Sequence, residues 1–205
     1  MRELVLGMIE VGCIQFSPKD PFTYASGLKG PIYCDNRLIP SHPKLRELVA
    51  KEFSSIIDSK KLSYDFVAGV ATAGITHATM LAHFREEPMV YVRSKPKGHG
   101  QGRMVEGDIS QGQSLLLVED LINQGSSIGK VIEGVRDQGM VVNNALCIVD
   151  YQMENARKYI GSLKVDYFSL INFRDLVDTA LTEKIIDEED YNLLLEWQKD
   201  PESWS

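Results

Sequence analysis

The sequence predicts an α/β protein with a central, mainly parallel sheet flanked by helices and a small N-terminal hood subdomain. Short apolar runs alternate with longer stretches in which apolar residues recur at helical spacing. Small or polar residues separate several of these runs from the helix that follows. The first 40 residues depart from this alternation and show a turn-rich strand pattern. Strands that alternate with helices imply βαβ units and right-handed crossovers.

The composition is that of one globular domain. The chain has 205 residues, of which 43% are hydrophobic and 25% are charged. We expect one compact unit made of an N-terminal helix and hood hairpin (residues 1–40) and an α/β core with C-terminal helices (residues 41–205). The 22 basic and 29 acidic residues give a net charge of −7. This balance argues against a nucleic-acid partner, which would need a positive surface.

Cysteine usage and hydropathy predict a cytoplasmic protein without membrane contact. The three cysteines, Cys13, Cys34 and Cys147, form no CxxC pair and no metal-ligand spacing, so they are expected to be reduced thiols. The N-terminus is too charged for a signal peptide. No apolar run approaches the ~18 residues that a membrane span needs.

The N-terminal segment is expected to hold a helix and a hairpin. The helix would bury Leu4, Leu6, Ile9 and Ile14 on one face. Strand-favouring residues at 23–24 and 32–34 flank a turn over 26–31, which predicts the hairpin. It is either a structural flap or a lid that covers a substrate.

The core is expected to follow in a regular order. Ser41 would cap the first core helix. That helix would bury Leu45, Leu48, Val49, Phe53, Ile56 and Ile57. The remaining expected elements are strand 66–70, helix 75–86, strand 89–93, strand 141–149, a polar helix or loop over 155–160, strand 165–170, and helices 173–181 and 188–197.

The stretch from Ser114 to Gly139 holds the main candidate site. An apolar strand, Leu115–Val118, is followed at once by Glu119 and Asp120. A turn of small or polar residues, 123–127, comes next, and a helix is expected to begin at Ser126 or Ser127. Backbone N–H groups at such a turn and helix N-terminus suit a phosphate. The two carboxylates suit ribose hydroxyls, or Mg²⁺ held through water. The pattern therefore predicts a ribose-phosphate site.

A second candidate is the loop between Arg93 and Arg103. It also contains Lys95, Lys97 and His99, together with three glycines. This composition suits either a solvated charged loop or a mobile loop that folds over a polyphosphate and excludes water.

A third candidate is the small-residue turn Thr72–Gly74. Taken alone, it is explained by close packing of a helix on a strand. However, the carboxyl ends of parallel strands meet at one edge of a sheet, and ligands collect there. We therefore expect this turn, the Arg93 loop and the 119–127 segment to share one crevice.

Several other chemistries are excluded by spacing. The 119–127 turn is not a P-loop, because Lys130 lies too far along the helix, and it is not GxGxxG. No GxSxG or HExxH motif is present. His77 and His83 fall on one expected helix and are interpreted as surface or satisfied histidines.

The segment from Val118 to Ser127 resembles the phosphoribosyl diphosphate (PRPP) signature of type I phosphoribosyltransferases. Further segments are similar to the orotate phosphoribosyltransferase family, in the form found in Gram-positive bacteria. They are FTYASG and PIYCDNR (residues 22–37), GVATAGITHA (69–78), YVRSKPKGHGQG (91–102) and VEDLI (118–122). The match spans about residues 15–140 and is weak in the last third.

This resemblance implies a type I phosphoribosyltransferase fold and transfer of the phosphoribosyl group from PRPP to orotate, with Mg²⁺ held through PRPP and water. It implies catalytic roles for Arg93, Lys97 and His99; His99 would protonate pyrophosphate or hydrogen-bond to it. It also implies a homodimer in which the loop Arg93–Gly102 enters the neighbouring subunit's site. The implied PRPP-binding residues are Arg93, Lys97, His99, Glu119, Asp120, Leu121, Ile122, Asn123, Gln124, Gly125, Ser126 and Ser127. Those implied near orotate are Tyr33, Cys34 and Asn123.

Two positions differ from the family pattern inside the turn itself. Asn123 and Gln124 stand where short side chains are usual, and we expect their amides to crowd the phosphate site. Two alternative functions stay open: a PRPP-binding regulator without turnover, and a phosphoribosyltransferase for another base. The cationic loop argues against the first, because a mere binder has little need for it, and PIYCDNR argues against the second.

Overall fold

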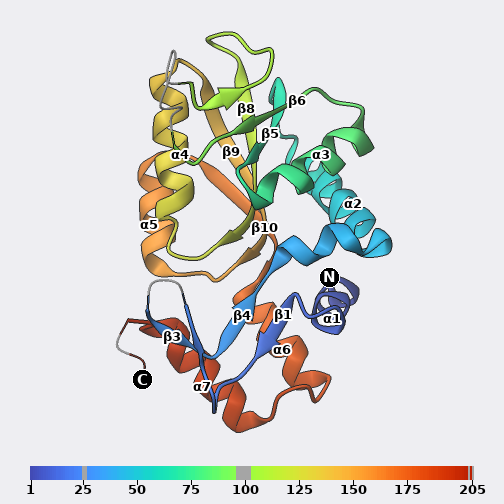
Figure 1. Ribbon diagram of the computed structural model, residues 1–205, viewed down its shortest axis with the longest axis vertical. Coiled ribbons are helices and arrows are strands. Elements are labelled where there is room, and N and C mark those ends of the chain that lie inside the picture. The colour runs from blue at the N-terminus through green and yellow to red at the C-terminus, as the bar shows by residue number, and fades with distance from the viewer. Residues whose placement is uncertain (25–26, 96–102, 203, 205) are drawn as a thin grey trace.

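The computed structural model describes residues 1–24, 27–95, 103–202 and 204. Within these residues the centre is a six-stranded sheet in the order β10-β9-β8-β5-β6-β7 (Figure 1). All neighbouring strands are parallel except β6 and β7, which are antiparallel. The strands are β5 (Phe66–Val70), β6 (Met89–Val92), β7 (Val105–Glu106), β8 (Ser114–Ile122), β9 (Val141–Asp150) and β10 (Asp166–Asn172).

Helices cover both faces of this sheet, as the apolar strands require. In Figure 1, α2 (Pro43–Lys60) and α3 (Ala73–Arg85) lie on one side, and α4 (Ser126–Asp137) and α5 (Glu154–Ser162) lie on the other. The central run Leu115–Val118 of β8 is almost fully buried between them. No helix in the described part of the chain has the length and apolar character needed to cross a membrane.

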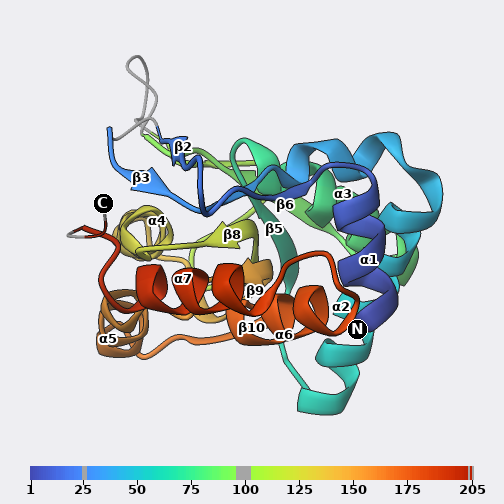
Figure 2. The same ribbon diagram turned by 90° about the horizontal axis from the view of Figure 1, so that it is seen from below.

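The N-terminal segment and the C-terminal helices together form a second body below the sheet (Figures 1 and 2). We call it the terminal layer. It consists of α1 (Arg2–Glu10), β1 (Ile14–Phe16), β2 (Phe22–Thr23), β3 (Lys29–Gly30), β4 (Ile32–Cys34), α6 (Phe173–Thr182) and α7 (Glu188–Lys199).

Contacts between residues far apart in sequence hold the terminal layer together. The Trp197 ring of α7 lies 6.5 Å from the Tyr24 ring and 5.7 Å from the Phe173 ring, measured between centroids. The Arg2 guanidinium pairs with the Glu183 carboxylate, with an Nε–Oε1 distance of 2.7 Å. The N-terminal segment thus packs on the C-terminal helices.

The predicted α/β core is confirmed, with changes at element boundaries. The polar stretch around 155–160 is a helix, α5, and not a loop. The short strand β7 was not predicted, because two residues carry no periodicity. The strand after Ser114 was expected to end at Val118, but β8 continues through the acidic pair to Ile122, because β9 pairs with it as far as Asp150.

Two predictions about the N-terminal segment were wrong in detail. The first helix ends at Glu10, and Ile14 belongs to β1, because the chain turns at Gly12 with a φ of 78°. The hairpin pairs β2 with β3, whereas Ile32–Cys34 pairs with β1. Pro31 separates these two pairings, since it has no N–H to continue a ladder.

The start of the first core helix was also placed wrongly. Ser41 ends a short 3-10 helix, η1 (Asn36–Ser41), and α2 begins at Pro43 with His42 as its N-cap. Proline is favoured at the first helical position, because its missing N–H has no partner there anyway. On the buried face, Leu48 and Ile56 are only half-buried, while Ala50 and Ser54 are buried.

Candidate active site

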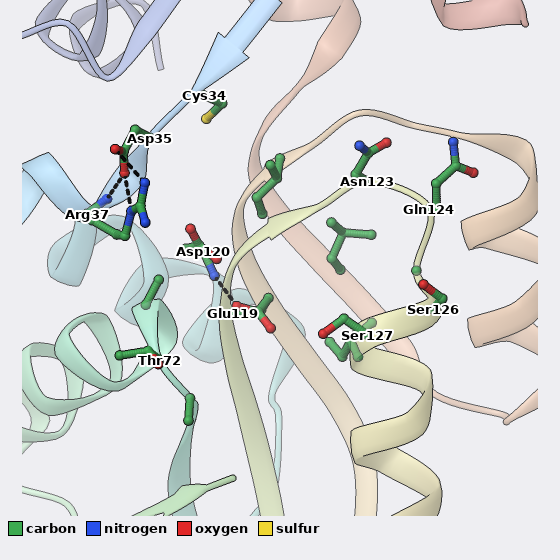
Figure 3. Close-up of a pocket in the computed structure, with 16 residues that line it drawn as sticks. Cys34, Asp35, Arg37, Thr72, Glu119, Asp120, Asn123, Gln124, Ser126 and Ser127 are labelled. Atoms are coloured by element: carbon green, nitrogen blue, oxygen red, sulfur yellow. Dashed lines mark hydrogen bonds and ion pairs between the residues drawn. The ribbon is translucent and has the colours of Figure 1, made fainter. Parts of the chain in front are cut away.

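A cavity of about 560 Å³ opens at the carboxyl edge of the sheet, between the terminal layer and the β8–α4 turn (Figure 3). Three segments line it. They are Cys34 at the end of β4 with Asp35 and Arg37 after it; Ala71, Thr72 and Ala73 at the turn from β5 into α3; and residues 119–128. The structure therefore brings two of the three predicted segments, the 72–74 turn and the 119–127 turn, to one crevice.

The two acids form one wall of this cavity. Glu119 is buried, whereas Asp120 is half-buried. The Asp120 backbone N–H donates to Glu119 Oε1 at 3.0 Å, so the Glu119 carboxyl folds back onto the strand. The Asp120 side chain is left beside the cavity (Figure 3).

The environment of Glu119 keeps its side chain neutral in the ligand-free protein. Burial raises the pKa of the Glu119 carboxyl well above its usual range, and the neighbouring Asp120 raises it further. A carboxyl of this kind becomes ionised when a cation or a positively charged reacting group arrives beside it.

The opposite wall is an anion-binding turn at the start of α4. Gly125 is the N-cap residue, and it has no side chain with which to cap the helix. The first N–H groups of α4 have no partner within the helix and are available to a phosphate. The side chains of Ser126 and Ser127 are exposed beside them.

Glycine is required at position 125 for two reasons. Its φ is 75°, a conformation that other residues adopt only with strain. A Cβ atom there would also lie 2.8 Å from Ala156 Cα of α5. Close packing against α5 therefore fixes the shape of the turn.

Asn123 and Gln124 both line the cavity beside the turn. In Figure 3 their side chains point away from Glu119 and Ser127. Gln124 also lines a separate cavity of about 150 Å³, next to the start of α5 and the end of α7. Asn123 Oδ1 is buried and has no hydrogen-bond partner among the described residues.

The predicted cationic loop is described only in part. Lys97 and His99 lie outside the described residues, as does most of the segment Arg93–Gly102. Arg93 follows β6, and its Nη1 lies 3.5 Å from Glu106 Oε1. Its Nε is buried without a hydrogen-bond partner in the described structure, and Arg93 does not line the cavity.

The two residues expected near orotate from the N-terminal segment separate. Cys34 lines the cavity. Tyr33 does not, because neighbouring strand residues point to opposite faces, and its ring packs 5.6 Å from the Phe22 ring.

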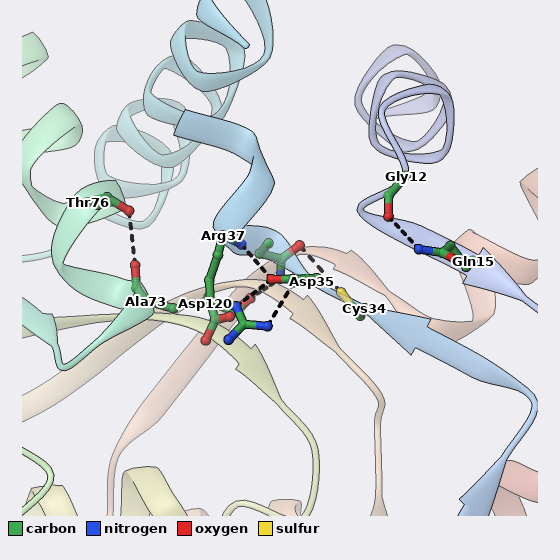
Figure 4. A network of polar contacts seen from close by, with 9 residues as sticks. Gly12, Gln15, Cys34, Asp35, Arg37, Ala73, Thr76 and Asp120 are labelled. Carbon is green, nitrogen blue, oxygen red and sulfur yellow. Dashed lines mark hydrogen bonds and ion pairs between the residues drawn. The ribbon is translucent and has the colours of Figure 1, made fainter. Parts of the chain in front are cut away.

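Asp35 and Arg37 line the cavity and were not predicted individually. Their side chains form a bidentate salt bridge, with Arg37 Nε 2.6 Å from Asp35 Oδ1 and Arg37 Nη2 2.8 Å from Asp35 Oδ2. Arg37 holds the pKa of the Asp35 carboxyl below its usual range. Figure 4 shows this pair beside Asp120. The signal was present, since both residues belong to the PIYCDNR motif.

The turn before α3 combines both of its proposed roles. A Cβ at Gly74 would overlap the Val118 carbonyl oxygen, so Gly74 allows α3 to pack on β8. Ala71, Thr72 and Ala73 line the cavity, and the Ala71–Thr72 peptide is cis.

The histidines of α3 agree with their interpretation as surface or satisfied groups except at one nitrogen of His77, whose imidazole otherwise bonds to the Asn36 backbone. His83 is exposed as expected, but His77 is buried. Its Nε2 has no hydrogen-bond partner among the described residues. Desolvation lowers the pKa of His77, so the imidazole is neutral.

The fold and the site together are those of a phosphoribosyltransferase. Residues 38–183 match the model of the phosphoribosyl transferase domain. An orotate phosphoribosyltransferase of Listeria monocytogenes is 40% identical over 203 residues, covering 99% of this chain and 97% of that protein. One from Bacillus cereus is 38% identical over 205 residues, covering 99% of this chain and 98% of its own length. The chain therefore belongs to the orotate phosphoribosyltransferase family.

Solved structures agree with this fold. Orotate phosphoribosyltransferase from Aeropyrum pernix superposes with a TM-score of 0.72 at 26% identity, covering 85% of this chain and 97% of that one. Leishmania donovani UMP synthase superposes with a TM-score of 0.81 at 22% identity, covering 96% of this chain and 42% of that one. The second similarity concerns the fold alone.

Proposed function

We propose that this protein transfers the 5-phosphoribosyl group from PRPP to orotate, which gives orotidine 5′-monophosphate and pyrophosphate for de novo pyrimidine synthesis. The observation that carries the proposal is one cavity with an uncapped helix N-terminus on one wall and two adjacent acids on the other. The full-length similarity to orotate phosphoribosyltransferases supports orotate as the acceptor.

The two walls of the cavity bind different parts of PRPP. The 5′-phosphate accepts hydrogen bonds from the N–H groups at the start of α4 and from the exposed Ser126 and Ser127 hydroxyls. The ribose hydroxyls donate to the Asp120 and Glu119 carboxyl oxygens. A phosphate beside these acids would be repelled, so the order of groups along the cavity fixes the orientation of the sugar.

The chemical step separates charge. As the bond between C1′ and the pyrophosphate oxygen breaks, its electron pair leaves with the oxygen and the ribose gains oxocarbenium character. An ionised Glu119 and Asp120 lie on the ribose side and stabilise that positive charge. Orotate is already an anion, so its ring nitrogen attacks C1′ without a strong general base and releases its proton to the departing pyrophosphate.

The leaving pyrophosphate requires cations that the described cavity lining does not provide apart from Arg37. We assign this task to the loop Arg93–Gly102, with Lys97, His99 and Arg93 as its anion-binding groups. Loop closure would exclude water and strengthen these charge interactions. We also propose that the protein is a homodimer in which this loop completes the partner subunit's site.

We propose that Mg²⁺ enters together with PRPP and is held through the substrate's phosphates and water. The described residues contain no cluster of three His, Cys, Asp or Glu that could hold a metal ion by themselves. Mg²⁺ usually binds through one or two carboxylates together with substrate phosphates and water. Glu119 and Asp120 would hold it through water, and the ion supplies positive charge to the pyrophosphate.

An assay with purified protein tests the proposal. PRPP, Mg²⁺ and orotate are mixed, and the loss of orotate absorbance is followed; uracil, hypoxanthine and adenine serve as alternative acceptors. Turnover of orotate alone supports the proposal. Tight PRPP binding without turnover of any base would instead indicate a regulator, and turnover of another base would change the acceptor.

Subunit mixing tests the shared loop. Lys97→Ala should lower kcat much more than it weakens orotate binding. Mixing Lys97→Ala with Asp120→Ala subunits should restore part of the activity, because one hybrid site then has both intact groups. No recovery at any mixing ratio would count against a site built from two subunits.

We place the protein in the cytoplasm, without a nucleic-acid or membrane partner. The three free cysteines and the net charge of −7 support this placement. Cell fractionation would test it.

A further inference from the structure

A fully buried amide connects the hood side of the cavity to the sugar side. Asn36 is the first residue of η1, directly after the two cavity-lining residues Cys34 and Asp35. Its side chain has an exposed fraction of 0%, which is unusual for asparagine. Buried amides are kept in proteins when their hydrogen bonds are made, so its partners are informative.

Those partners belong to both walls of the active site. Asn36 Nδ2 donates to the backbone carbonyl of Asp120 at 2.8 Å, across 84 residues of sequence. The Cys34 thiol donates to Asn36 Oδ1 at 3.4 Å. One side chain thus links the residue that lines the hood wall with the acid that lines the sugar wall.

The backbone of Asp120 is held at both of its polar groups. Its N–H donates to Glu119 Oε1, and its C=O accepts from Asn36. The β5 ladder stops supporting β8 before this point, since its last pair joins Gly69 to Val118. On the β5 side, side chains therefore replace the strand neighbour at Asp120, while β9 still pairs with β8 as far as Ile122; Asn36 is the one of these side chains that comes from outside the sheet.

Asn36 is itself fixed from behind. The buried His77 imidazole of α3 interacts with the Asn36 backbone. Helix α3 is held against β8 by the close approach at Gly74. The Asn36 amide therefore lies between α3 and β8, and these two elements cannot move apart without breaking the core.

We propose that Asn36 is a positioning residue for phosphoribosyl transfer. It sets the orientation of the Asp120 carboxylate toward the ribose, and it couples this carboxylate to Cys34 on the hood wall. This inference rests on the proposed function. Asn36 does not line the cavity, so it acts through Asp120 and Cys34. In a low-dielectric environment the loss of such a bond costs more than it would at the surface.

Substitutions at position 36 test this role. Asn36→Ala removes the donor and should lower kcat/KM for PRPP by about 10-fold or more. Val177→Ala, a buried truncation in α6 at 0% exposure, is the matched control for lost stability and should keep near wild-type kinetics at a temperature where it is folded. Equal losses in the two variants, after correction for folded fraction, would reduce Asn36 to a packing role.

Asn36→Asp should change the pH dependence of activity, which a packing role for Asn36 would not do. At low pH the new carboxyl is protonated and can donate to the Asp120 carbonyl in place of Nδ2; at high pH it is ionised and repels that carbonyl. Burial at this fully buried position, next to other acids, raises the pKa of the introduced carboxyl toward neutral pH, so the activity ratio of Asn36→Asp to wild type should rise at least about 10-fold from pH 8.5 to pH 6. A ratio that does not change with pH would overturn the proposal.

The ratio cancels contributions from the groups already present around position 36. These titratable and charged groups are Cys34, Asp35, Arg37, His77, Glu119 and Asp120. PRPP affinity, measured by calorimetry on the same variants, tests the positioning role of Asn36 separately from the proposed transfer of the phosphoribosyl group to orotate. If wild type binds PRPP but does not turn over orotate, the proposed function fails, while a tenfold affinity loss in Asn36→Ala would still support the positioning role.

Discussion

The sheet core and the terminal layer contribute to the same cavity in different ways. In the core, the site residues lie on one continuous segment, β8–turn–α4, and adjacent strands support them. On the other wall, Cys34 ends a terminal-layer strand of three residues, and Asp35 and Arg37 follow it at the start of η1. Their position depends on contacts between the two ends of the chain, such as Tyr24 with Trp197.

Under the proposed function, the core wall carries the phosphoribosyl chemistry and the wall from the terminal layer contacts the acceptor base. The core presents backbone N–H groups and acids that cannot move without disturbing the sheet. The terminal layer adds a second wall that lies outside the sheet and reaches the core through contacts such as that of Asn36 with Asp120. We therefore expect damage to the core segment to affect PRPP first, and damage to the terminal layer to affect stability and the acceptor base.

Trp197→Ala should have the largest effect on stability. Trp197 is fully buried, and its ring lies 5.5 Å from that of Tyr151, so its truncation should lower the free energy of unfolding by about 3–5 kcal/mol. PRPP affinity of the folded fraction should stay within a few-fold of wild type, while the KM for orotate rises.

Denaturant titration and calorimetry measure both quantities. Trp204→Ala, at a half-buried position after the end of α7, is the control and should lower the unfolding free energy by about 1 kcal/mol or less. A loss of PRPP affinity as large as the loss of orotate affinity would show that the two regions are not separable.

Gly125→Ala should come next and should act on the core side. It combines backbone strain at positive φ with the close approach to Ala156, and should destabilise by about 2–4 kcal/mol. Because the turn itself moves, PRPP affinity should fall as well.

Gly12→Ala is the matched control in the terminal layer. Gly12 has a φ of 78°, and no atom lies within 4 Å of the position that a Cβ would take. Gly12→Ala should therefore lose stability through backbone strain alone, by about 1 kcal/mol. Its PRPP affinity should not change. If both variants lost the same stability, packing against α5 would not be what fixes the turn.

Glu119→Gln should have a smaller and pH-dependent effect. The native pKa of Glu119 is raised, so between its unfolded and folded values the native state keeps a proton that the unfolded chain has lost. The contribution of Glu119 to native-state stability is complete below its pKa in the unfolded chain. It is lost as pH rises through its pKa in the folded protein. At pH 8 the Gln variant should be more stable than wild type by about 1–2 kcal/mol, although less active.

Chemical denaturation of the ligand-free protein from pH 5 to pH 9 measures this effect. Glu47→Gln, at an exposed position of α2, serves as the control and should follow wild type. An unchanged pH dependence in Glu119→Gln would mean that the buried acid is not the group that titrates.

Arg2→Ala should have the smallest effect. The Arg2–Glu183 pair joins the two ends of the chain, but the Arg2 side chain is 68% exposed, and exposed ion pairs contribute little. The melting temperature should fall by about 2 °C or less, and less in high salt. A larger fall would mean that surface pairing, and not the Trp197 cluster, holds the terminal layer.

The sequence by itself determined the core and most of the site. The apolar run Leu115–Val118, the acids after it and the Gly/Ser turn specify their structure locally, because strand, turn and helix signals follow one another without a gap. The motif PIYCDNR also marked the segment that forms the other wall.

Only the tertiary structure decided how the terminal layer is assembled and which residues of that motif face the cavity. Strands of two or three residues carry too little periodicity to reveal their partners, so the pairing of Ile32–Cys34 with Ile14–Phe16 was not predictable. The burial of Asn36 and its bond to Asp120 join positions 84 residues apart. Such a contact is not encoded in local sequence, because it exists only once β8, η1 and α3 are packed together.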